Sequence, residues 1–292
     1  MKITNLSKKI GQKQILEKID FVLYPNEIVG LVGRNGSGKT TLFRTIADHY
    51  LPESGTITIN DRNLQQDPAL KAQIFYIDEV DNFLKAYSLK KIGEFYRAAY
   101  PFFDQDQFLA LTKEHQLPLH LSYRRMSKGM QGLFQMILAI SSNATYLLLD
   151  EPFDGLDVII RKKVIGLLLG HIADGKRTAV IASHNLQELE GIIDRALLIK
   201  GQTIVKDYRL ETMRETAKKF QMVFKTKKVP QIVKDNSKLI AFQGRVVVAV
   251  FENYDTQLAA KILAEQPLVF EELPLSLEDL FEANLNKEEL YR

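Results

Sequence analysis

The chain of 292 residues contains neither cysteine nor tryptophan. Without cysteine there is no disulfide framework, no thiol nucleophile and no thiolate-bound zinc or iron–sulfur centre, and the composition fits a reducing compartment. Long apolar runs are also missing, since the stretches 146–149 and 164–169 are far shorter than the roughly 20 residues of a membrane-spanning helix. The N-terminal segment has neither the apolar core nor the small-residue cleavage site of a signal peptide. The sequence therefore predicts a cytoplasmic product.

A strong excess of one charge sign is missing as well. The 39 basic and 36 acidic residues give a net charge of +3, and so small a surplus argues against a dedicated nucleic-acid binder. Hydrophobic residues make up 46% of the chain and charged residues 26%, which is ordinary for a globular protein and excludes a collagen-like or wholly disordered one. The length allows one large or two ordinary domains.

The first two thirds of the chain alternate short apolar runs with amphipathic stretches, which is typical of an α/β domain. Strands are predicted at 3–6, 15–22, 28–32, 55–59, 74–77, 146–149, 178–182 and 196–199, and helices after residue 41 and over 157–171. Residues 80–140 are mostly helical in pattern and rich in aromatic side chains, so we expect a helical subdomain there. These elements define a first domain over residues 1–206.

The composition changes near residues 207–219, a charged stretch that we expect to be helical. Beyond it, strands are predicted at 220–224, 238–242, 245–251 and 268–271, and helices at 256–264 and 277–285. Residues 207–292 are therefore predicted to form a small α+β appendage.

Residues 33–41, GRNGSGKTT, match the pattern G-x-x-x-x-G-K-[ST] and lie between a buried strand and a helix, the context that separates a phosphate-binding loop from an ordinary glycine-rich turn. Glycines let the backbone curl so that successive N–H groups point at phosphate oxygens. Lys39 is placed to reach the β- and γ-phosphates, and Thr40 offers its hydroxyl to Mg²⁺. The nucleotide-binding residues predicted here are Gly33, Asn35, Gly36, Ser37, Gly38, Lys39, Thr40 and Thr41.

A second acidic motif, TYLLLDEP, follows at residues 145–152. Asp150 at the strand tip can orient Mg²⁺ through its water shell, and Glu151 can polarise the attacking water. Alone, the motif would equally fit a plain strand followed by an acidic turn. Together with the phosphate-binding loop it predicts nucleotide hydrolysis.

Three further motifs follow in a fixed order: MSKGMQ at 126–131, DGLD at 154–157 and IASHN around His184. With the loop and the Asp-Glu pair, they resemble the nucleotide-binding subunits of ATP-binding cassette (ABC) transporters over about residues 1–205. The resemblance implies a P-loop NTPase with a mixed sheet and a helical subdomain, and ATP and Mg²⁺ as cofactors. It also implies a dimer of identical or paralogous cassettes, a separate membrane permease as partner, and a place on the inner face of the cell membrane.

The resemblance also implies roles for single residues. Ser127, Lys128, Gly129 and Gln131 lie in the signature that cradles the ATP of the partner cassette, Asp157 lies in the D-loop, and His184 corresponds to the γ-phosphate sensor. Glu79 stands where the family has the Q-loop glutamine, and Ile10 where an aromatic side chain stacks on adenine. Without the resemblance, Ser127 would be interpreted as a helix N-cap and His184 as an ordinary hydrogen-bonded histidine.

The stretches AAYPFFD and PLSLEDLFEANL further resemble the bacitracin, lantibiotic-immunity and phenol-soluble-modulin exporters, which implies export of a peptide or amphipathic compound. Two other functions stay open: an ABC ATPase acting on ribosomes or DNA, and a regulatory subunit that binds ATP without turnover. A single P-loop and the lack of heptads disfavour the first. Glu151 and His184 disfavour the second.

Overall fold

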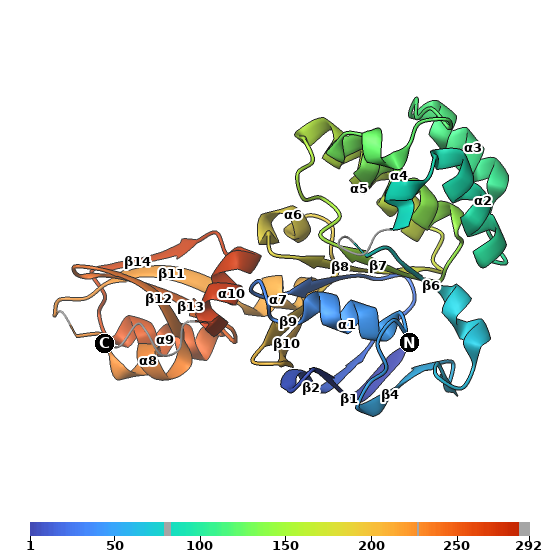
Figure 1. The fold of residues 1–292 in the computed structure, drawn as a ribbon. Coiled ribbons are helices and arrows are strands. Elements are labelled where there is room, and N and C mark those ends of the chain that lie inside the picture. The colour runs from blue at the N-terminus through green and yellow to red at the C-terminus, as the bar shows by residue number, and fades with distance from the viewer. Residues whose placement is uncertain (79–82, 227, 286–292) are drawn as a thin grey trace. The chain divides into compact units, whose positions relative to one another are not determined.

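The computed structural model describes residues 1–78, 83–226 and 228–285. It forms two compact units: Met1–His184 with Ile192–Asp207, and Asn185–Gly191 with the chain from Tyr208 onward (Figure 1). In the described part of the chain, no helix is both long and apolar enough to cross a bilayer.

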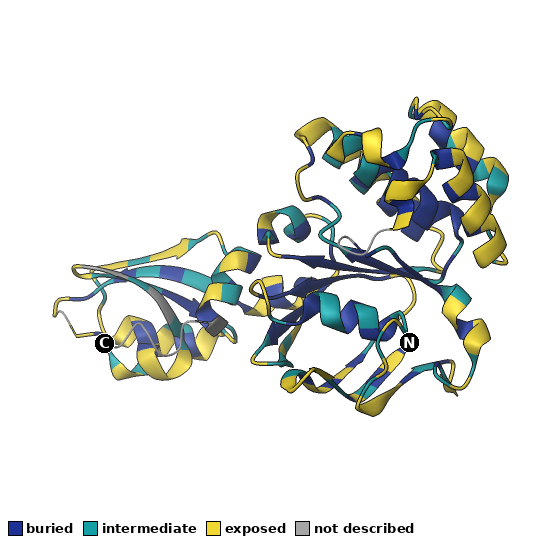
Figure 2. Ribbon diagram, viewed as in Figure 1, coloured by how far each residue is buried: buried dark blue, intermediate teal, exposed yellow. Residues whose placement is uncertain are grey.

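A six-stranded sheet forms the centre of the first unit, in the order β10-β9-β3-β8-β7-β6. The strands span β3 Ile28–Val32, β6 Ile74–Tyr76, β7 Tyr146–Asp150, β8 Thr178–Ser183, β9 Arg195–Lys200 and β10 Thr203–Arg209. From β9 to β6 all neighbours are parallel. Every residue of β3 and β8 is buried, which explains their continuous apolar sequences, because a parallel sheet is covered on both faces (Figure 2).

A second, antiparallel sheet has the order β2-β1-β4-β5, with β1 Lys2–Ile10, β2 Lys13–Val22, β4 Ser54–Ile59 and β5 Arg62–Asn63. Helix α1, Lys39–Ile46, lies between the two sheets (Figure 1). One hydrophobic core joins all three layers and includes Leu6 and Ile57, Phe43 of α1, and Leu148 and Val180 of the parallel strands. The fold is thus the expected α/β architecture with a mixed sheet core.

The helical part of this unit contains α2 Leu89–Ala99, α3 Gln105–Glu114, α4 Lys128–Ser141 and α5 Val158–Ile172, with short 3₁₀ turns at Pro68–Gln73, Phe83–Ala86 and Tyr123–Arg125. Its aromatic residues pack on one another: the ring of Phe134 lies 6.0 Å from that of Phe108 and 6.2 Å from that of Tyr123, and all three are buried. The aromatic-rich stretch therefore supplies the core of the helical subdomain.

The second unit contains α6 Leu186–Glu190, α7 Leu210–Thr216, β11 Lys218–Val223, α8 Gln231–Asn236, β12 Lys238–Gln243, β13 Val246–Phe251, α9 Thr256–Ala264, β14 Val269–Leu273 and α10 Leu277–Leu285. Its sheet is antiparallel, in the order β12-β13-β11-β14. The core includes Phe220, Met222, Phe251 and Ile262, and Phe220 stacks on Phe270 at 4.4 Å. It is an α+β unit with its own core.

The helix predicted over residues 207–219 is wrong at both ends. Strand β10 continues to Arg209 and β11 starts at Lys218, so only Leu210–Thr216 is helical. Side chains of β10 alternate between half-buried and exposed, because it is an edge strand with one face in water. The charged residues on the exposed face of β10 were therefore interpreted as the polar face of a helix. The short helices α6 and α8 were also missed.

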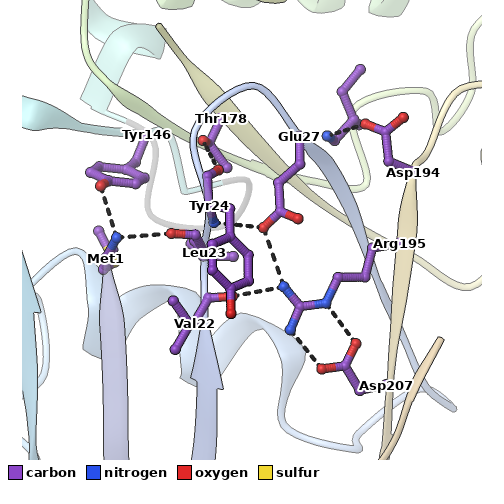
Figure 3. A network of polar contacts seen from close by, with 11 residues as sticks. Met1, Val22, Leu23, Tyr24, Glu27, Tyr146, Thr178, Asp194, Arg195 and Asp207 are labelled. Carbon is purple, nitrogen blue, oxygen red and sulfur yellow. Dashed lines mark hydrogen bonds and ion pairs between the residues drawn. The ribbon is translucent and has the colours of Figure 1, made fainter. Parts of the chain in front are cut away.

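Ion pairs fix the start of β3 (Figure 3). Arg195, 5% exposed, donates to both carboxylate oxygens of Asp207 at 2.6 Å, to Val22 O at 2.7 Å and to Glu27 Oε1 at 3.2 Å. The hydrogen bonds that Arg195 donates to Asp207 raise the pKa of Arg195, although burial opposes the shift. Asp194 accepts from the backbone N of Ile28 at 2.8 Å. The amino end of β3, opposite the glycine-rich loop, is therefore held by paired charges.

The α-ammonium group of Met1 belongs to the same region (Figure 3). It donates to Leu23 O at 3.0 Å and to the Tyr146 hydroxyl at 2.8 Å. Burial lowers its pKa, and the charge of Glu27 offsets part of that shift. These contacts tie β1 to the end of β2 and to the start of β7.

Candidate nucleotide-binding site

The glycine-rich loop connects the end of β3 to the first residue of α1, Lys39. Gly36 and Gly38 have φ of 78° and 104°, a left-handed backbone that glycine adopts at least cost. A Cβ on Gly33 would lie 2.5 Å from Ile199 Cγ2 and from Ser37 Oγ, so close packing excludes a side chain there. The loop is therefore shaped by its glycines, and its curl leads directly into a helix N-terminus.

A pocket of about 430 Å³ opens over this loop. It is lined by Ile15, Asn35, Gly36, Ser37, Gly38, Lys39, Thr40, Thr41, Asp78, Asp150 and Glu151. Because β3, β6 and β7 belong to one parallel arrangement, the residues that follow their carboxyl ends meet at one edge, where open α/β sheets bind ligands. The structure thus brings most of the loop residues predicted from sequence together with the Asp-Glu pair.

Lys39 carries the positive charge of the pocket wall. Its side chain is 7% exposed, and Nζ donates to Gly33 O at 2.8 Å and lies 3.9 Å from Glu151 Oε1. Burial lowers the pKa of Lys39, while the charges of Glu151 and Asp150 act in the opposite direction. An ammonium group with few protein oxygens around it is suited to bind phosphate oxygens.

Glu151 directly follows β7 and has φ of 47°, and its backbone N donates to Ala182 O at 2.9 Å. Its Oε2 accepts from the backbone N of His184 at 3.3 Å and lies 2.9 Å from His184 Nδ1. The neighbouring parallel strands β7 and β8 bring together two residues that are 33 positions apart in the sequence. A carboxylate oriented by a histidine can hold a water molecule and accept its proton.

The signature residues lie at the start of α4 and do not line this pocket. Ser127 caps the helix, its Oγ accepting from Met130 N at 3.2 Å, and Gln131 donates to Tyr123 O at 3.2 Å. Asp157 caps α5 in the same way, accepting from Ile159 N at 2.9 Å. Within one chain, these side chains act as helix caps and loop braces.

The remaining predicted residues have different outcomes. Glu79 lies outside the described residues. Ile10 is 45% exposed and does not line the pocket, whereas Ile15 does. Sequence reasoning missed both Ile15 and Asp78. Asp78 had a signal that could have been used, because an acidic residue after the apolar run 74–77 repeats the pattern of Asp150 after 146–149.

The donors around the pocket suit magnesium bound together with phosphate. Thr40 and Asp150 line the same pocket and offer oxygen ligands of the kind that Mg²⁺ prefers. Among the described residues, no group of three or more acidic, histidine or cysteine side chains could hold a metal by itself. In nucleotide sites, one or two protein oxygens usually bind Mg²⁺, and phosphate oxygens and water complete its coordination.

Comparison with known proteins agrees with this geometry. A family model described as ABC transporter matches residues 16–154, and one described as AAA domain, putative AbiEii toxin, Type IV TA system, matches residues 119–190. The chain is 29% identical to the ABC transporter ATP-binding protein YtrB of Bacillus subtilis, over 96% of both chains. It is 30% identical to the L-cystine transport system ATP-binding protein TcyN of Escherichia coli, over 70% of this chain and 88% of TcyN.

A solved ATP-binding subunit of an ABC transporter has the same fold, with a TM-score of 0.66 at 24% identity over 73% of this chain and 91% of that one. The fold and the pocket define a P-loop ABC cassette, whose fold binds ATP. The chain belongs to the ABC transporter ATP-binding proteins and is an ATP-binding subunit of such a transporter.

Proposed function

We propose that the chain is the ATP-hydrolysing motor of its transporter, and that two cassettes close on ATP to drive a separate membrane permease. The observation that carries this proposal is the pocket itself, in which Lys39, Asp150 and Glu151 face one space and His184 contacts Glu151. Nucleotide binding without hydrolysis would need only the glycine-rich loop. The oriented carboxylate beside it is the feature that suits hydrolysis.

In this proposal the loop N–H groups and Lys39 bind the phosphates, and Thr40 and Asp150 hold Mg²⁺, which supplies positive charge against the polyphosphate. Glu151 would orient the water that attacks the γ-phosphorus and accept its proton, while the bond from the γ-phosphorus to the β–γ bridging oxygen breaks and ADP leaves. His184 holds the Glu151 carboxylate and contacts the γ-phosphate. By the family resemblance, Glu79 would sense Mg²⁺ and its water.

The signature residues complete the pocket of the partner cassette. The observation behind this step is that Ser127, Lys128 and Gly129 begin a helix of 14 residues yet do not line the pocket of their own chain. Helix N-termini favour anions. Gln131 and Asp157 brace the two helix starts at which a second nucleotide would be bound.

The permease partner follows from the family, whose named relatives are ATP-binding subunits of transporters. We place the subunit on the inner face of the cell membrane, with an identical or paralogous cassette and without nucleic acid. Export of a peptide or amphipathic compound is proposed from the resemblance of AAYPFFD and PLSLEDLFEANL to the exporter subgroup.

The test compares the wild type with Glu151→Gln, and Glu114→Gln on the exposed side of α3 serves as the matched control. We expect Glu151→Gln to bind Mg-ATP but to hydrolyse it about 10²–10⁴-fold more slowly, because an amide cannot accept the proton. The ATP-bound dimer should then accumulate in size-exclusion chromatography. Unchanged turnover would remove Glu151 from catalysis, and a wild type that binds ATP without turnover would instead support a regulatory subunit.

A further inference from the structure

The nucleotide pocket is unusually acidic for a site that binds polyphosphate. Three carboxylates line it, those of Asp78, Asp150 and Glu151, and Lys39 is the basic residue among the described lining residues. Negative charges that share partly dehydrated surroundings repel one another more strongly than they would in water. Something must therefore compensate for the additional carboxylate.

Asp78 forms an ion pair with Arg44 of α1. Arg44 does not itself line the pocket. Arg44 Nε lies 2.5 Å from Asp78 Oδ2, and Nη2 lies 2.9 Å from Oδ1, so the guanidinium binds both carboxylate oxygens. The Asp78 side chain is 5% exposed. This two-point geometry fixes the direction of the carboxylate as well as its charge.

Arg44 is itself held in place. Its Nη1 donates to the Tyr50 hydroxyl at 2.8 Å, and the guanidinium lies 5.6 Å from the centre of the Tyr50 ring. The hydrogen bond with Asp78 raises the pKa of Arg44, so the guanidinium stays charged. The Tyr76 hydroxyl also donates to Asp78 Oδ2, at 3.4 Å.

Asp78 and Asp150 influence the same space. Tyr76 of β6 is paired with Leu148 of β7, so the two carboxylates follow neighbouring parallel strands at the same edge. Burial raises the pKa of Tyr76, and the charges of Asp150 and Asp78 raise it further. The electrostatic fields of both carboxylates therefore overlap at the tyrosine.

We propose that Arg44 is a positioning residue of the nucleotide site that acts through Asp78, neutralising and fixing this carboxylate so that the pocket accepts the charge of ATP. The inference rests on the proposed nucleotide site and adds a residue to it. Removing Arg44 leaves a nearly buried, uncompensated carboxylate beside the phosphates, a situation that is far more costly than losing both partners of the pair.

The experiment measures Mg-ATP and Mg-ADP binding by calorimetry for wild type, Arg44→Met, Asp78→Asn and the double variant, with Arg97→Met on the exposed side of α2 as control. We expect Arg44→Met to lose about tenfold or more in ATP affinity and less in ADP affinity, because the repulsion grows with ligand charge. The double variant should return to within about threefold of wild type, since it removes the uncompensated charge.

A pair that only fastens α1 to β6 would behave differently. Arg44→Met would then weaken ATP and ADP equally, and the double variant would remain as weak as the single one. Either result overturns the inference. It is also overturned if Arg44→Met has a native far-ultraviolet circular dichroism spectrum and binds ATP with wild-type affinity. If the wild type itself bound no Mg-ATP, the proposed nucleotide site would fail instead, so the two failures are distinguishable.

Discussion

Lys39 occupies a position in which burial makes a charged ammonium group energetically unfavourable. The side chain is nearly buried, and burial lowers its pKa, while among the described residues Gly33 O lies 2.8 Å and Glu151 Oε1 3.9 Å from its Nζ. A charge kept in such a place contributes little to the free energy of unfolding. In the proposed site, its role is to bind phosphate oxygens of the nucleotide.

We therefore expect Lys39→Met to abolish Mg-ATP binding and to leave the melting temperature without nucleotide close to that of the wild type. Thermal unfolding with and without Mg-ATP measures both effects, because a ligand that binds only the folded state raises the melting temperature. Lys113→Met, on exposed α3, should keep the full nucleotide-dependent increase. A nucleotide-dependent increase in Lys39→Met would contradict the role of this lysine.

At the scale of single residues, the sequence predicted those positions whose chemistry is local. The glycine-rich loop and the Asp-Glu pair each lie within a few consecutive residues, so spacing alone placed them. Asp78 and its partner Arg44 are 34 positions apart, and their pairing exists only once α1 packs beside β6. Ile15 lines the pocket for a similar reason, because only the folded chain brings β2 beside Gly38 of the loop.

At the scale of elements, the predictions succeeded where a helix was long enough to display its period. Helices over 256–264 and 277–285 were predicted with their observed limits, and Asp255 caps the first by accepting from Leu258 N at 2.7 Å. Helix α6 has only five residues, too few to display a period of 3.6. Strand β10 was not predicted, because an exposed edge strand and the polar face of a helix have similar compositions.

The start of α10 combines a reciprocal cap with an ion pair. Asp279 accepts from Ser276 N at 2.9 Å, and Ser276 Oγ accepts from Asp279 N at 3.1 Å. Lys219 of β11 donates to Asp279 Oδ1 at 2.7 Å. Partial burial raises the pKa of Asp279, but the bonds from Lys219 and Ser276 lower it by more, so the net shift is downward.

Asp279→Asn should therefore destabilise the second unit by about 1 kcal/mol at neutral pH, because it removes the charged acceptor of the cap and of Lys219. A lowered pKa means that the carboxylate stabilises the fold fully above about pH 4, its unfolded value, and progressively less as the pH falls through the folded value. Hydrogen exchange of the α10 amides should be faster in the variant at pH 7, and the difference in melting temperature should shrink in acid. Glu282→Gln, exposed on the same helix, is the control. Equal exchange in both variants would contradict this account.

At the scale of the whole molecule, the chain consists of a cassette with the pocket and a second unit with a separate core. All of the described pocket residues belong to the first unit. The sequence predicted an appendage from the change in composition near residue 207. It did not predict that residues 185–191, directly after His184, would group with the distant C-terminal part, because such grouping depends on long-range packing.

Deleting the chain from Tyr208 onward should leave Mg-ATP affinity within about threefold of wild type, because the residues that line the pocket and the core of the cassette remain. The melting temperature should fall, because Leu186 and Leu189 are buried in the full chain and would lose the unit with which they group. Calorimetry and thermal unfolding measure the two effects. A truncated protein with a native far-ultraviolet spectrum and no ATP binding would disprove this division of labour.

The backbone at Glu151 places stability and turnover in opposition. A left-handed φ of 47° costs a side-chain-bearing residue roughly 1 kcal/mol that glycine would avoid, so folding alone favours glycine at this position. The proposed reaction needs a carboxylate there. Replacing Glu151 with glycine would relax the backbone and, in the proposed mechanism, leave a cassette that binds ATP without hydrolysing it. In the proposed mechanism, the carboxylate at this position therefore serves turnover and lowers the stability of the fold.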